Sequence, residues 1–104
     1  INLNISGGSG AGLVIINGYI TGSLYCHITN TSSKEISLTK FEVKDGSTGN
    51  IVLYTDEASK LGSLKAGQST NLGGQMRYVY LPIFSWTFTY EGKEYQVSEQ
   101  YKRY

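Results

Sequence analysis

An alternating aromatic segment followed by a tight turn constrains the fold of this chain more than any other feature. Four aromatic side chains alternate with Ser and Thr: Phe84, Trp86, Phe88 and Tyr90. A period of two places all four rings on one face of a β-strand. Glu91-Gly92 follows, and Gly92 can adopt the positive φ of a tight turn, so residues 93–97 are predicted to return as a second strand. The sequence therefore predicts a β-hairpin at the edge of an all-β core.

Length and composition favour a single β-rich domain. The chain has 104 residues, which suits one domain spanning residues 1–104 and leaves no room for a second. Helical periodicity is almost absent, and 13 glycines among many Thr, Ser, Tyr, Ile and Val residues favour strands joined by turns. About seven closely spaced strands without crossover helices predict an all-β, immunoglobulin-like sandwich of two antiparallel sheets.

The first half of the chain contains a second hairpin signal. Residues 1–5 are predicted as a short strand and the glycine-rich residues 7–12 as a flexible connector. Residues 13–16 then lead into Asn17-Gly18, a strong hairpin signal. From Ile20 to Ile28 the even positions are apolar or small, which predicts a long strand with one buried face.

The second half continues as short strands. Residues 36–43 are predicted as a strand whose apolar positions change parity near Thr39-Lys40, which requires a β-bulge there. A turn at 45–49 precedes a strand at 51–54, and residues 56–60 are either a loop or one helical turn. A strand at 68–72 is expected to end at Gly73-Gly74. Phe84, Trp86 and Phe88 are expected to form the inter-sheet core with two other strands, through Leu24, Ile28, Phe41 and Val43.

Residues 20–75 resemble small immunoglobulin-like modules of bacterial secreted and surface proteins, the FxLYD-type domains. The matching residues are Asn30, Phe41-Glu42-Val43, Asp45, Gly49, Ile51-Val52, Leu61, Leu64, Gly67 and Ser69. Lys44 stands where that family tends to carry an aromatic residue. The resemblance implies a non-catalytic module of an exported bacterial protein, located outside the cell, at its surface or in the periplasm. Because the first residue is Ile1, a cleaved signal peptide or a trimmed boundary is expected before it.

The chemistry-bearing residues do not predict an enzyme, a metal site or a cofactor. Cys26 and His27 are the only residues of their types, and adjacent strand residues face opposite sides, so they cannot form a nucleophile–base pair. Cys26 is expected to be buried and unreactive. The acidic pairs Asp56-Glu57 and Glu91/Glu94 could serve acid–base work or bind a hard cation, although Glu91 is most simply a solvated turn residue, and the 45–49 turn contains only one acid. Asn30-Thr31-Ser32 matches a glycosylation sequon, a pattern that often arises by chance.

Charge and hydropathy disfavour a nucleic-acid partner and a membrane-spanning segment. The formal net charge is +1, and Lys102-Arg103 is the longest basic run, which disfavours binding to nucleic acid. The longest apolar runs, 13–16 and 51–54, are far shorter than the ~20 residues of a membrane-spanning helix.

Nine tyrosines are the remaining anomaly. The chain is expected to leave the core beyond Val97. The tyrosines at the C-terminal end would then lie at the surface, near the tyrosines that precede Pro82. Four tyrosines form the candidate binding surface: Tyr78, Tyr80, Tyr101 and Tyr104. Exposed tyrosines offer rigid amphipathic contact area. We expect a non-enzymatic interaction or adhesion module that contacts a protein partner through this sheet face or the end loops. The alternatives are a carbohydrate-binding module with a tyrosine platform, and rings that only support cross-strand pairs.

Overall fold

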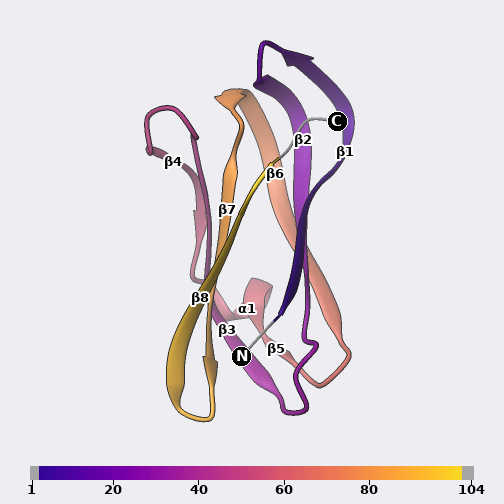
Figure 1. The fold of residues 1–104 in the computed structure, drawn as a ribbon, viewed down its shortest axis with the longest axis vertical. Coiled ribbons are helices and arrows are strands. Elements are labelled where there is room, and N and C mark those ends of the chain that lie inside the picture. Colours follow the sequence, from indigo (N-terminus) through magenta and orange to yellow (C-terminus); the bar gives the residue numbers. More distant parts are fainter. Residues whose placement is uncertain (1–2, 102–104) are drawn as a thin grey trace.

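Two antiparallel sheets pack face to face in the computed structural model, which describes residues 3–101, with residues 6–11 described in their backbone only (Figure 1). One sheet has the strand order β1 (Asn4–Ile16), β2 (Tyr19–Thr29) and β6 (Ser69–Tyr80). The other has the order β4 (Ile51–Thr55), β3 (Ile36–Lys44), β7 (Ile83–Tyr90) and β8 (Lys93–Gln100), and the short β5 (Ser63–Leu64) also pairs with β3. One helical turn, α1 (Ala58–Leu61), follows β4.

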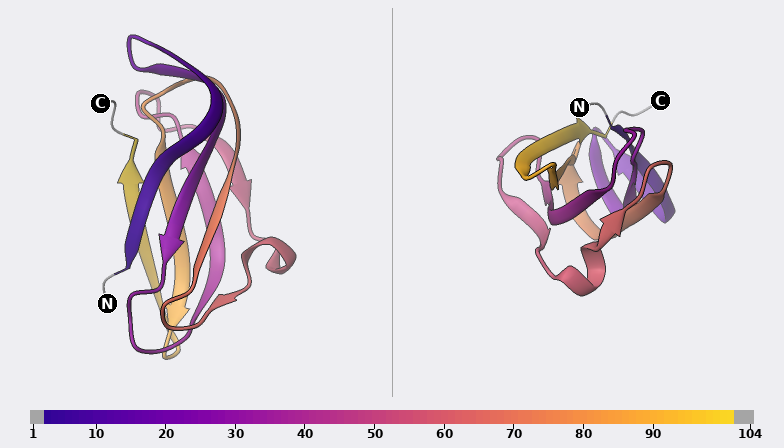
Figure 2. Two further views of the ribbon diagram at one scale, coloured as in Figure 1. Left: turned by 90° about the vertical axis from the view of Figure 1, so that its right-hand side faces the viewer. Right: turned by 90° about the horizontal axis from the view of Figure 1, so that it is seen from below.

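This strand order is that of an immunoglobulin-like sandwich, in which the first two strands share a sheet with a late strand, and the third strand lies between the fourth and the seventh in the other sheet. The predicted fold class is therefore confirmed, with eight strands in the described residues rather than about seven. The right-hand view of Figure 2 looks along the strands and shows the two layers, and the edge strands β1 and β8 run near each other where the sheets meet.

Both predicted hairpins are present, and their turns have the expected backbone. Asn17 and Gly18 have φ values of 52° and 85°, and Glu91 and Gly92 have φ values of 49° and 79°. Two consecutive positive φ values match the twist of the flanking strands. In the second hairpin β7 lies inside its sheet and β8 at the edge, so the aromatic strand is central rather than peripheral.

The two glycine-rich segments were predicted wrongly. β1 runs through residues 7–12 with bulges near Gly7 and Ala11, and β6 continues through Gly73 and Gly74. A Cβ atom on Gly73 would lie 2.1 Å from the Leu24 carbonyl oxygen of β2. Gly73 permits close approach of the β2 backbone, which is a role of glycine inside sheets and not in flexible connectors.

The predicted bulge and the ambiguous segment are both resolved by packing. Leu38 pairs with Phe88 and Lys40 with Thr87, so Thr39 is the extra residue in β3, as the change of parity predicted. The segment 56–60 enters α1, and Leu61 at its end is buried. The burial of Leu61 favours the helical turn over a loop, a choice that the intrinsic propensities of these residues did not decide.

The predicted core is confirmed. Phe84, Trp86 and Phe88 of β7 are fully buried, together with four residues of the facing and neighbouring strands: Leu24, Ile28, Phe41 and Val43. Trp86 Nε1 donates a hydrogen bond to Cys26 Sγ at 3.3 Å. This contact joins β2 and β7, the strand pair that antibody domains cross-link by a disulfide. Burial raises the pKa of the Cys26 thiol to about 11.

Candidate binding surface

Three tyrosine rings gather on the outer face of the β1-β2-β6 sheet. Tyr19, at the start of β2, stacks on Tyr78 with ring centroids 4.3 Å apart and an interplanar angle of 7°. It also meets Tyr80 edge-on at 5.0 Å. Tyr78 and Tyr80 lie near the end of β6, so Tyr19 joins two of the four tyrosines predicted as a binding surface.

Two aliphatic side chains of β1 extend the cluster. Ile16 pairs with Tyr19, and Val14 lies two residues before Ile16 on the same face of β1. Val14, Ile16 and Tyr78 are 54%, 58% and 64% exposed. We call these five residues the tyrosine patch: Val14, Ile16, Tyr19, Tyr78 and Tyr80. Contiguous apolar exposure of this kind is typical of interaction surfaces.

Tyr78 adopts a backbone conformation that bulky residues rarely accept. Its φ is 56°, and Leu81 shortly after it has a φ of 34°. Between the Ile20–Val79 and Gly22–Met76 pairs, β6 has one more residue than β2, so Tyr78 lies in a bulge. A non-glycine residue in this region costs about 1–3 kcal/mol, and such strain is concentrated at functional sites.

Several hydrogen bonds hold the strained segment in place. Asp45 Oδ2 accepts from the Tyr80 amide at 3.1 Å, and the Gly46 amide donates to the Tyr80 carbonyl at 2.7 Å. The Leu81 amide donates to the Gly18 carbonyl at 3.0 Å. A Cβ on Gly18 would lie 2.7 Å from the Tyr80 ring, so glycine is needed there for the ring to cover the hairpin tip.

Asp45 is fixed as a carboxylate by its own turn. Its Oδ1 accepts from the Ser47 hydroxyl at 2.6 Å and from the amides of Ser47 and Thr48 at 2.8 and 3.2 Å. The Ser47 hydroxyl, followed by the backbone amides, lowers the pKa of Asp45 to about 2. The Asp45 carboxylate therefore serves as an anchor for β6, and the 45–49 turn directs its oxygens to protein donors rather than to a cation.

The other two predicted tyrosines do not extend the patch. β8 stays paired with β7 as far as Gln100, and the Tyr101 amide donates to the Pro82 carbonyl at 2.8 Å. Tyr101 is half-buried against the core, so the expectation that the chain leaves the core beyond Val97 is wrong for residues 98–101. No ring contact joins Tyr101 to the tyrosine patch within residues 3–101. Tyr104 lies outside the described residues.

The sequence contained a partial signal for Tyr19. It follows the Asn17-Gly18 turn and precedes the buried Ile20, so alternation placed it on the outer face. Its pairing with Tyr80, 61 positions later, depends on the register of β2 and β6 and could not be predicted from either segment alone.

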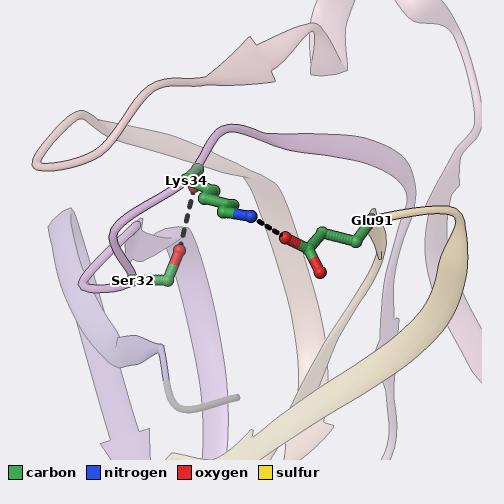
Figure 3. Close-up of polar contacts among 3 residues, drawn as sticks. All are labelled: Ser32, Lys34 and Glu91. Atoms are coloured by element: carbon green, nitrogen blue, oxygen red, sulfur yellow. Dashed lines mark hydrogen bonds and ion pairs between the residues drawn. The ribbon is translucent and has the colours of Figure 1, made fainter.

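The opposite end of the sandwich is tied together by polar contacts. Figure 3 shows the Lys34 ammonium directed at the Glu91 carboxylate, which joins the β2–β3 loop to the β7–β8 turn. The Ser32 hydroxyl donates to the Lys34 carbonyl at 2.9 Å. The hydrogen bond to Glu91 raises the pKa of Lys34. Glu91 thus has a structural partner, although the ion pair is exposed and contributes little to stability.

Asn30 is the buried centre of this end. Its side-chain amide donates to the carbonyls of Lys34 and Leu64 at 2.8 and 2.9 Å. Its Oδ1 accepts from the amide and hydroxyl of Ser32 at 3.0 and 2.5 Å. Both donors and the acceptor are thus engaged. Because Asn30 is fully buried, its sequon is not accessible for glycosylation in the folded domain.

The remaining candidate groups are separate from one another. Cys26 is buried, whereas His27 faces the other side of β2 and is half-exposed. Glu57 forms an exposed ion pair with Lys60 at 3.7 Å. Within residues 3–101, no three His, Cys, Asp or Glu side chains come close enough together to hold a metal ion.

Comparison with known proteins identifies no family: no family model matches this chain, and no curated protein matches it significantly. No helix in the described residues is long and apolar enough to cross a membrane.

Proposed function

We propose that this domain is a non-enzymatic interaction module that binds a protein partner through the tyrosine patch. The observation that carries the proposal is Tyr78, which is held at a positive φ although its side chain is 64% exposed. The exposed ring gains little from burial, and its stacking on Tyr19 only balances the strain, so Tyr78 adds no net stability to the free domain and we infer that its benefit lies in a complex. Stacking on Tyr19 fixes the ring before the partner arrives, and this reduces the entropy lost on binding.

The chemistry of the tyrosine patch suits a protein surface. Tyrosines bury large rigid areas and keep a hydroxyl available at the rim, and they are enriched among residues that dominate binding energy. Val14 and Ile16 add an apolar border. A partner with an apolar centre and hydrogen-bond acceptors around it complements this surface.

Other properties of the chain support a non-enzymatic role. The thiol of Cys26 is buried and has a raised pKa, and Asp45 is committed to backbone donors. An adhesive role in an exported bacterial protein, outside the cell, at its surface or in the periplasm, rests on the resemblance to FxLYD-type modules alone.

The test is affinity capture from a bacterial surface extract with three matched forms of the domain. Tyr78→Gly removes the ring and relieves the positive φ, so we expect its stability to stay within about 1 kcal/mol of the wild type, because the relief and the lost stacking offset each other. Tyr25→Ser removes an exposed tyrosine of β2 that belongs neither to the tyrosine patch nor to the other sheet, and is the control.

We expect the wild type and Tyr25→Ser to retain a common protein and Tyr78→Gly to lose it. A photo-crosslinking residue at position 78 should attach to that protein, whereas the same residue at position 25 should not. Equal capture by the wild type and a folded Tyr78→Gly variant would contradict the proposal.

A further inference from the structure

Two small polar residues are buried on a sheet face that no other layer covers. Ser85 and Thr87 alternate with Phe84, Trp86 and Phe88 and therefore point away from the core, yet they are only 5% and 6% exposed. Except for Ser98, the side chains beside them on β3 and β8 are longer. Thr87 lies between Lys40 and Gln96, and Ser85 lies between Glu42 and Ser98. Because the β7 side chains are short, we infer a shallow strip along β7 with these two hydroxyl groups at its floor, and we call this strip the groove.

The groove deepens into a hollow beside the β3 bulge. The hollow has a volume of about 220 Å³ and is lined by Lys40, Thr87, Glu94, Tyr95 and Gln96. The bulge places both Thr39 and Lys40 opposite Thr87, and the Thr39 hydroxyl donates to the Thr87 carbonyl at 3.2 Å. Bulges redirect side chains and are frequent next to binding sites.

Opposite charges border the hollow without neutralising each other. Lys40 comes from β3 and Glu94 from β8, on the two sides of β7, and within the described residues neither forms an ion pair. Together with the Gln96 amide and the Thr87 hydroxyl, they offer both donors and acceptors with no net charge. A ligand rich in hydroxyl groups matches this combination, whereas a strongly acidic or basic ligand would meet one like charge.

An exposed ring extends the same face. Tyr54 of β4 pairs with Glu42, which pairs with Ser85, so all three side chains lie on the outer face. Tyr54 is 49% exposed. The C–H face of a sugar ring can pack on such an aromatic ring while its hydroxyls bond to neighbouring polar groups. The floor residues Ser85 and Thr87 are polar, and this favours a ligand rich in hydroxyl groups over the apolar anchor of a peptide.

We propose that the groove along β7, with Lys40, Tyr54, Thr87, Glu94 and Gln96, binds a neutral oligosaccharide. The hollow is smaller than the roughly 300–1,000 Å³ of pockets that enclose drug-sized ligands, so it takes one sugar unit of a chain that continues along the open groove. The site lies on the opposite sheet from the tyrosine patch, and it does not depend on the function proposed for that patch.

The experiment is an NMR titration of the isotope-labelled domain with neutral oligosaccharides of glucose, N-acetylglucosamine, mannose and galactose. At least one is expected to give saturable shifts at the amides of Thr87, Gln96 and Tyr54. Tyr54→Ser and Gln96→Ala, which alter exposed side chains, should each raise the Kd about tenfold, the size expected for one or two lost ligand contacts. Tyr78→Gly should leave it unchanged.

Three results would overturn the proposal. The first is the absence of shifts at about 10 mM of every oligosaccharide, which is tenfold above a millimolar Kd. The second is a set of shifts centred on Tyr19 and Tyr78, which would assign sugar binding to the tyrosine patch. The third is saturation of the groove by short neutral peptides but by none of the sugars, which would make it a peptide site.

Discussion

Replacing Asn30 by Ala should destabilise this domain by about 2–4 kcal/mol, although the residue is polar and lies in a loop. The substitution removes the side-chain amide that donates to the Lys34 and Leu64 carbonyls. It also removes the Oδ1 that accepts from the Ser32 amide and hydroxyl. The Lys34 carbonyl keeps the Ser32 hydroxyl as a donor, but the buried Leu64 carbonyl loses its bond to Asn30. An unsatisfied buried group costs about 1–3 kcal/mol, and a lost hydrogen bond costs roughly 0.5–1.5 kcal/mol.

The measurement is urea denaturation monitored by Trp86 fluorescence, with stability read from the midpoint at an unchanged slope. Asn50→Ala is the matched control, because Asn50 is exposed and its substitution should change stability by less than about 0.5 kcal/mol. Ser32→Ala should fall between the two, because its hydroxyl contacts are partly exposed. A loss below about 1 kcal/mol for Asn30→Ala would show that water replaces the amide and that the network does not join the loops.

Three further predictions follow from the core and the Asp45 turn. Trp86→Ala should cost about 3–5 kcal/mol in chemical denaturation, since it opens a cavity at a fully buried site; a loss below about 1 kcal/mol would contradict the packing. A thiol reagent should label native Cys26 slowly and unfolded Cys26 quickly, because burial raises its pKa to about 11; rapid labelling at neutral pH would be inconsistent with its position. Asp45 has a folded pKa lowered from 3.8 to about 2, so its contribution to stability is present above pH 3.8 and is lost as the pH falls through about 2. The stability difference between the wild type and Asp45→Asn should therefore shrink between pH 5 and pH 2, and a constant difference would refute this role.

The sequence by itself determined which residues face inward. In β2 and β7 the period of two is a property of the strand backbone, so the burial of Leu24, Ile28 and Trp86 followed from local alternation. The same reasoning located the bulge at Thr39, because a change of parity requires an extra residue wherever the strand pairs. The Asn17-Gly18 turn is equally local, since it depends on the backbone freedom of two residues.

Only the tertiary structure decided which outward residues meet. Tyr19 reaches Tyr78 because the β2–β6 register, fixed by the packing of the whole core, places the two strands side by side. The groove over Ser85 and Thr87 depends on the longer side chains of β3 and β8 beside them, which β7 alone does not specify. Gly73 was predicted to end its strand, because the sequence does not show how closely the β2 backbone approaches this glycine. Local patterns assign faces, but contacts between faces depend on strand order and register, and these are set by interactions between segments far apart in the chain.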